Sequence, residues 1–152
     1  MGWSARSNQV QKSCHSLEKP QIHRFFYRYN VFTLKECCGF SGNELRKLLI
    51  TCPSLYMEED EKVINKNFDF IHNEVGFPHA SILKKPEVLK DKRPWEKRAR
   101  LQFLQDTGRA QFDPKQPLFV PLADFMLDSD EEFCRKHARV DVDLYNEYLK
   151  TF

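Results

Sequence analysis

Apolar side chains recur along this chain at the spacing of one helical face. After Ser41 they fall at positions i, i+3, i+4 and i+7, which places them along one side of an α-helix. Similar stripes predict a second helix that ends near residue 75, a third after Pro94 and a last one after Asp141. The four stripes consist of Leu45, Leu48, Leu49 and Cys52; Ile64, Phe68, Ile71 and Val75; Trp95, Ala99, Leu101 and Leu104; and Val142, Tyr145 and Leu149. Two shorter helices are predicted around Ile82 and Leu83 and around Phe133 and His137.

Residues with special backbone preferences mark where these helices begin and end. Ser41 and Glu44 have the spacing of a capping box, and Ser129 and Glu132 repeat it. A proline cannot continue a helix, so the first helix ends before Pro53. The remaining signals are an acidic first turn at Glu58–Glu61, helix starts at Pro78, Pro94 and Asp141, a stop at Pro86, helix-closing glycines at Gly76 and Gly108, and a proline-rich loop over residues 108–121.

A block of sequence repeats along the chain. Pro53–Leu55 recurs as Pro86–Val88, and Phe68–Ile71 recurs at the same offset as Leu101–Leu104. A glycine closes each block. Stacked helical repeats have periods in this range, because each unit buries its apolar stripe against its neighbour. We therefore expect an all-α fold, a short α-solenoid with a C-terminal helical cap, in which function lies on a surface groove rather than in a deep cleft.

Composition excludes several classes of protein. No stretch approaches the roughly 20 apolar residues that span a bilayer, so we expect no membrane partner. The 5 cysteines are odd in number and form no Cys-x-x-Cys pair, so buried free thiols in a reducing compartment are expected. Cys134 and His137 have the spacing of half a metal site, but no second half matches them, and we predict neither a metal nor a cofactor. The common catalytic motifs are missing from the sequence, which argues against an enzyme.

The start of the chain differs from the rest, so we divide it into an N-terminal segment, 1–38, and a helical repeat domain, 39–152. Positions 1–17 carry two basic side chains, four serines and no acid, which is typical of an organelle-targeting sequence. The alternative is a tail without a defined role. Residues 19–36 are rich in aromatic side chains but have no clear period, and they could form a partial cap helix or a strand-like segment.

Positive charge is concentrated in residues 84–115, which hold ten basic and five acidic side chains, although the net charge of the chain is only +2. Acids gather instead at 58–61 and 124–132. Segregated charge can create a positive face that attracts phosphates; the alternative is a solvated helix surface. Arg98 or Arg100 could point inward, and Trp95 could stack on a base or join the core. The predicted contacts are Lys84, Lys85, Lys90, Lys92, Arg93, Lys97, Arg98, Arg100, Arg109 and Lys115.

The repeated unit resembles the mitochondrial transcription termination factor (mTERF) family. The resemblance rests on the leucine-rich helix and proline stop at 48–55, the Phe68–Ile71 block, Val75-Gly76-Phe77, and the second copies at 82–89 and 101–104. Three tail segments, at 108–114, 130–134 and 148–152, are similar to the C-terminus of an animal member. The resemblance covers Gly39 to Phe152. Full family members carry about twice as many repeats, so this chain could be a fragment, a short isoform or a degenerate copy.

The resemblance implies a curved helical stack with a basic concave groove, a place in the mitochondrial matrix, and binding of mitochondrial DNA or ribosomal RNA. It further implies a monomer that regulates mitochondrial transcription or takes part in ribosome assembly. Two alternatives stay open: a helical adaptor that binds protein through the aromatic segment and the acidic patches, and a truncated copy with weakened nucleic-acid binding. A pentatricopeptide-type RNA binder is a weaker interpretation, because such units lack the proline stops.

Overall fold

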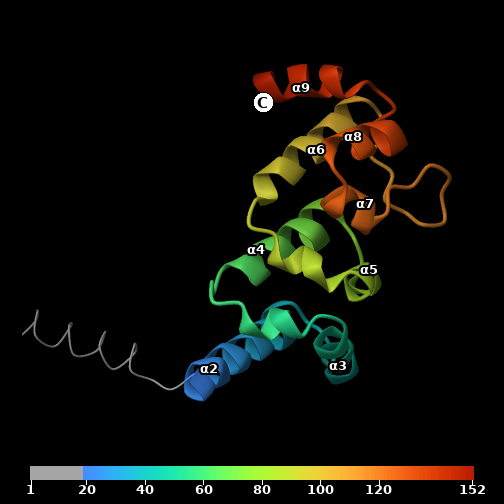
Figure 1. Ribbon diagram of the computed structural model, residues 1–152. Helices are drawn as coiled ribbons and strands as arrows, with labels where there is room; N and C mark the ends of the chain where they lie inside the picture. Colours follow the sequence, from blue (N-terminus) through green and yellow to red (C-terminus); the bar gives the residue numbers. More distant parts are fainter. Residues whose placement is uncertain (1–18) are drawn as a thin grey trace, which may run out of the picture.

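The structure, a computed structural model, describes residues 19–152, with side chains from Arg24 onward. Over this range the chain consists of helices joined by loops. The helices lie in an elongated stack that follows chain order, from α2 at one end to α9 at the other (Figure 1). The predicted fold class, an all-α solenoid of short helical repeats with a helical C-terminal cap, is therefore confirmed. The proposed targeting segment lies outside the described residues.

Each of the first two repeats consists of a long helix, a short helix and a 3₁₀ turn. The first contains α2 (Lys19–Phe32) with its π-helical extension η1 (Thr33–Cys37), α3 (Gly42–Thr51) and η2 (Pro53–Met57). The second contains α4 (Val63–Phe68) with η3 (Asp69–Val75), α5 (His79–Lys84) and η4 (Pro86–Lys90). The rest of the chain forms α6 (Pro94–Asp106), α7 (Leu122–Leu127), α8 (Asp130–Phe133) with η5 (Cys134–Ala138), and α9 (Val142–Thr151).

The aromatic-rich segment is helical, which resolves the choice that its sequence left open. It forms α2 and η1, the long helix of the first repeat. This helix packs against η2, just as α4 packs against η4 in the second repeat. The two repeats are thus built in the same way.

Local sequence signals set most of the helix ends. The Ser41 hydroxyl accepts a hydrogen bond from the Glu44 N–H while the Glu44 carboxylate accepts one from the Ser41 N–H, so this capping box is confirmed. Gly76 and Gly108 have φ angles of +99° and +72°, a region that side chains disfavour. Both glycines follow the last turn of a long helix, as predicted.

The acidic run before α4 differs from its prediction. We expected Glu58–Glu61 to form the first turn of the helix, but α4 begins at Val63. The Asp60 carboxylate accepts a hydrogen bond from the Lys62 N–H in a turn that precedes the helix. Glu58 is buried and forms an ion pair with Lys92 of the next repeat. The packing between repeats has thus drawn one acid inward.

One continuous apolar core runs through the stack. Leucines and isoleucines from the predicted stripes fill it together with aromatic rings, among them Phe40, Phe70, Phe77, Phe125 and Phe133. Trp95 was placed on the buried side of its helix, and this is wrong: its side chain is 60% exposed. Leu101 is only partly buried. Among residues 19–152 no helix combines the length and the apolar character that crossing a bilayer requires.

In each of the first two repeats, a buried asparagine joins the long helix to the end of the 3₁₀ turn. The Asn30 side-chain amide donates to the backbone carbonyls of Tyr56, at 2.7 Å, and Glu58, at 3.0 Å. The Asn67 amide donates in the same way to the carbonyls of Leu89, at 2.9 Å, and Asp91, at 2.7 Å. Both asparagines are buried on a long helix, and both bind the end of the following 3₁₀ turn. Those carbonyls cannot find a partner within so short a helix, so the amides satisfy them.

Arg100 occupies the corresponding position on α6, one repeat offset after Asn67. Its guanidinium donates to the carbonyls of Phe125, at 2.8 Å, and Asp128, at 2.7 Å, and to the Asp130 carboxylate at 2.9 Å. It also lies 4.9 Å from the centre of the Phe133 ring. Only 5% of the side chain is exposed. This larger side chain binds the end of α7 and the start of α8, which follow a long loop after α6.

We expect Asn67→Ala to lower the free energy of unfolding by about 2–3 kcal/mol, because it leaves two buried carbonyls without a donor. Asn65→Ala is the matched control. Asn65 is exposed on the same helix, so its replacement should change stability by less than about 0.5 kcal/mol. Urea unfolding followed by circular dichroism measures both. Equal stability of the two variants would contradict the role of Asn67.

Arg100→Ala should cost about 3 kcal/mol or more, because it strands the buried carbonyls that the guanidinium now satisfies. Arg98→Ala, two residues away on the exposed side of α6, should cost less than about 1 kcal/mol, since its ion pair with Glu74 is exposed. Thermal unfolding of the two variants compares them directly. A larger loss for Arg98→Ala would refute this assignment.

Candidate nucleic-acid interface

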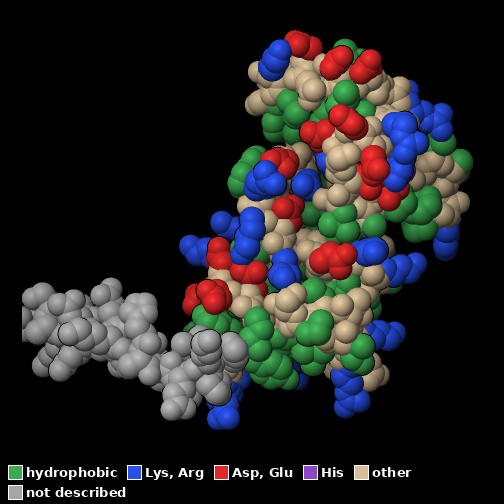
Figure 2. All heavy atoms as spheres, viewed as in Figure 1, with side chains coloured by type: hydrophobic (Ala, Val, Ile, Leu, Met, Phe, Trp, Pro, Cys, Tyr) green, Lys and Arg blue, Asp and Glu red, His purple; other side chains and the backbone are tan. Residues whose placement is uncertain are grey.

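The structure pairs several of the predicted contact residues with acids. Arg98 binds Glu74 of the preceding repeat at 2.6 Å, and Lys92 binds the buried Glu58. Lys97 lies 3.7 Å from Asp91, which follows η4, and Arg93 lies 3.4 Å from Glu96 on α6. The charges that are segregated in the sequence therefore meet in space. Figure 2 shows acidic and basic side chains next to one another over the middle and upper parts of the visible face.

Arg100 does not belong to the surface at all. It was among the predicted phosphate contacts, but its guanidinium is buried, and both terminal nitrogens donate to groups of α7, α8 and the turn between them. A side chain in this position cannot reach a ligand without opening the core. The guanidinium of Arg100 is thus a structural group, and we remove it from the predicted set.

The other predicted residues lie on three separate hollows or between them. Lys90 and Lys92 line one hollow beside η2, and Lys84 and Lys85 line a second one beneath the loop that precedes α7. Arg109 lines a third, beyond the end of α6. Lys115 is exposed on the loop. The basic residues of the sequence window are thus divided among separate hollows, and the one beside η2 also carries three acids, Glu58, Glu59 and Asp60.

One hollow combines basic side chains with an exposed aromatic ring. It lies where α4 meets the start of α6, has a volume of about 220 Å³ and is lined by Trp95, Lys62, Lys66 and Lys92. Asp60 and Asp91 also line it. We call it the Trp95 hollow. Because the ring is exposed and flat, it offers a surface on which an unpaired base could stack, with basic groups close by for the neighbouring phosphates.

Lys62 and Lys66 were missed in the sequence. They directly follow the acidic run 58–61, so their local window has no positive excess. Their spacing of four residues on a predicted helix was the available signal, since it puts both lysines on one face. The stripe formed by Ile64 and Phe68 marks the opposite side as buried, and both lysines are indeed exposed.

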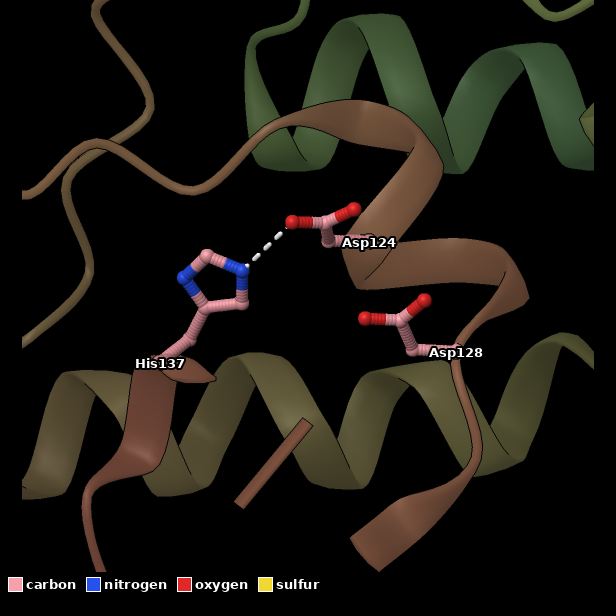
Figure 3. A group of neighbouring side chains, drawn as sticks. All are labelled: Asp124, Asp128 and His137. Atoms are coloured by element: carbon pink, nitrogen blue, oxygen red, sulfur yellow. Dashed lines mark hydrogen bonds and ion pairs between the residues drawn. The ribbon is translucent and has the colours of Figure 1, made fainter. Parts of the chain in front are cut away.

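His137 pairs with acids rather than with Cys134. Its Nε2 atom lies 2.8 Å from the Asp124 carboxylate (Figure 3). One carboxylate oxygen of Asp124, one of Asp128 and a ring nitrogen of His137, the atoms that could bind a metal ion, all lie within 4.8 Å of one another. Lys136 Nζ lies 3.2 Å from Asp128, and this hydrogen bond raises the pKa of Lys136 above its ordinary value. The two carboxylates are thus already matched by two basic groups.

The cysteines offer no activated thiol in this region. Burial raises the pKa of Cys134 to about 11, so its thiol stays protonated at neutral pH. Cys38 and Cys52 are also buried, whereas Cys37 is exposed. These four are free thiols, and Cys14 lies outside the described residues.

Comparison with known proteins agrees with this architecture. The mTERF family model matches residues 22–134. The chain is 36% identical over 124 residues to "Transcription termination factor 3, mitochondrial" of Drosophila melanogaster, covering 82% of this chain and 34% of that protein. The rat protein of the same name is 35% identical over 92 residues, covering 60% of this chain and 22% of its own length. The mouse protein is 36% identical over 84 residues, covering 55% and 20%.

The chain therefore spans about a third or less of the length of these relatives. The family model nevertheless covers most of the described residues: the first repeat from residue 22 onward, the whole second repeat, and the buried Asn30 and Asn67. The chain belongs to the mTERF family.

Proposed function

We propose that this chain binds nucleic acid in the mitochondrial matrix and regulates mitochondrial gene expression, acting as a monomer by binding rather than by catalysis. Its membership of the mTERF family and the names of its relatives, which are mitochondrial transcription termination factors, support this role. The partner would be mitochondrial DNA or ribosomal RNA. Transcription control and ribosome assembly are both compatible with such a partner.

The observation that carries the proposal is the exposure of Trp95. A tryptophan side chain that is 60% exposed forgoes much of the stabilisation that burial would give it. Here it lies at the N-terminal end of α6 beside three lysines. Indole rings that stack on bases, flanked by groups that bind phosphate, are a common way to hold single-stranded nucleic acid. The Trp95 hollow therefore favours an unpaired segment over an intact duplex.

The contact set differs from the one that the sequence predicts. At the hollow we propose Trp95, Lys62, Lys66 and Lys92, with Arg93 beside them. Lys92 would exchange its bond with Glu58 for a phosphate, or share it. We propose Lys84, Lys85, Lys90 and Lys115 as outlying electrostatic contacts, because they are not paired with an acid within residues 24–152.

A second candidate function is a protein-binding adaptor. It is favoured by α2, which exposes Phe25 and Phe32 to 57% and 59%, and by Ile50 on α3, which is 82% exposed. Apolar groups gathered at one end of the stack suit a protein partner. The two functions respond differently to salt: an apolar contact should survive an ionic strength at which phosphate contacts fail.

Trp95→Ala should weaken binding of a single-stranded oligonucleotide by about 5- to 150-fold, since stacking contributes about 1–3 kcal/mol per base. Trp95→Phe, which retains a flat ring, should recover part of the loss. Filter binding compares the affinities of the three chains. Quenching of tryptophan fluorescence in a Trp3→Phe chain that keeps Trp95 then reports whether this indole contacts the oligonucleotide, because the chain has two tryptophans. Unchanged affinity of Trp95→Ala would remove the hollow from the interface.

Lys62→Gln and Lys66→Gln should each lower the slope of log K against log salt concentration by about 0.7, the value for one phosphate contact on a single strand. Lys150→Gln is the control, because Lys150 is bound to Glu147 on α9 at the far end of the stack. Filter binding at several salt concentrations gives the slopes. A slope that is near zero in the unmodified chain would reject phosphate binding altogether.

A further inference from the structure

A second hollow carries positive charge in a different part of the molecule. It lies between the C-terminal end of α6, the loop that follows it and the end of η5, and has a volume of about 380 Å³. Its charged lining residues are Arg109, Lys136 and Arg139, with His137 beside them, and within the described part of the chain no acid lines it. We call it the Arg109 cavity. Its volume falls within the range of small-molecule sites.

Arg109 is the most informative residue of this cavity. Among the described side chains, four lysines and arginines are not exposed: Lys90, Lys97, Arg100 and Arg109. Lys90 donates to Ser54, Lys97 lies beside Asp91, and Arg100 has the partners given above. Arg109 has no acidic partner among residues 24–152, and its Nη1 atom is shielded from solvent without a hydrogen-bond acceptor. An anion in the cavity would compensate the charge of this partly buried guanidinium.

Asp124 of α7 and Asp128 at its C-terminal end position two side chains on the opposite side of the cavity. Asp124 holds Nε2 of His137 and Asp128 holds the Lys136 ammonium. The second ring nitrogen of His137, Nδ1, lies on the edge of the ring that faces away from both carboxylates (Figure 3). The acids thus fix a histidine and a lysine on a wall of the cavity while standing outside its lining themselves.

Arg139 completes the wall from an unusual backbone position. Arg139 follows the last turn of η5 and has a φ of +54°. Gly76 has the equivalent position after η3 in the second repeat. In residues 19–152 the only non-glycine residues with positive φ are Leu118 and Arg139, and both line this cavity. Side chains adopt this region at a cost, so the backbone of Arg139 has a conformation that a glycine would adopt more easily.

We propose that the Arg109 cavity binds a phosphate group. The guanidinium groups of Arg109 and Arg139 suit the geometry of phosphate oxygens. The Lys136 ammonium, which Asp128 holds in place, is a further donor on the same lining. The phosphate could belong to a free phosphate ester or to a nucleic acid. If the phosphate belongs to a nucleic acid, this inference rests on the function proposed above. If it belongs to a free phosphate ester, it does not, because the cavity and the Trp95 hollow are separate sites.

Isothermal titration of the full chain with inorganic phosphate, against chloride at matched ionic strength, tests this proposal. We expect one saturable site. Arg109→Gln and Arg139→Gly should each weaken it by about tenfold or more, the effect of losing one charge-assisted hydrogen bond. Arg135→Gln is the matched control, because Arg135 is exposed on η5 but does not line the cavity.

Arg139→Gly separates binding from folding. Glycine tolerates the backbone angle at this position, so the variant should melt at the same temperature as the unmodified chain or higher. A stable Arg139→Gly variant that has lost phosphate supports the site. The proposal is overturned if the unmodified chain shows no saturable phosphate binding, or if Arg139→Gly binds phosphate as well as Arg135→Gln does.

A pair of oligonucleotides with the same sequence, with and without a 5′-phosphate, identifies the source. Tighter binding of the phosphorylated strand, abolished by Arg139→Gly, supports a nucleic-acid phosphate in the cavity. Equal binding of the two strands, with phosphate binding intact, supports a free phosphate ester. Trp95→Ala should leave the phosphate titration unchanged, so a failure of the Trp95 hollow is told apart from a failure of this cavity.

Discussion

The stack depends on buried side chains that bind the open ends of short helical turns. A 3₁₀ turn or a helix of six residues leaves most of its carbonyls without an internal partner. Asn30 and Asn67 supply that partner from the neighbouring long helix, and Arg100 does so in the last repeat. Without these donors the proline-initiated turns would bury unsatisfied carbonyls, at about 1–3 kcal/mol for each. The apolar stripes alone could not fix the position of those turns, because apolar contacts have no preferred direction.

The same packing decides which charges remain available. Stacking one repeat on the next brings Glu58 to Lys92 and Glu74 to Arg98. These pairs cross the boundary between repeats, so they align neighbouring units while they neutralise part of the basic window. Other basic groups, such as Lys62, Lys66 and Arg109, form no ion pair within residues 24–152. That is the physical reason for placing ligand contacts there.

Local signals were enough to predict much of the fold from sequence. The capping box at Ser41, the glycine at Gly76 and the proline stops act within a few residues of themselves, so their effect does not depend on the rest of the chain. The common offset of the repeated blocks then predicted that the helices form stacked repeats. The candidate site was harder to predict. Whether Arg100 points inward or Trp95 outward depends on residues far away in the sequence, which no local pattern shows.

Each of these buried hydrogen bonds also joins residues that are close in the sequence. The donor and its carbonyl are separated by 26 residues for Asn30, 22 for Asn67 and 25 for Arg100. Contacts of such short range form quickly, and a unit need not wait for distant segments. As the polypeptide leaves the ribosome, the first unit can close before the second has been synthesised. The order of folding would then follow the order of translation, one unit after another.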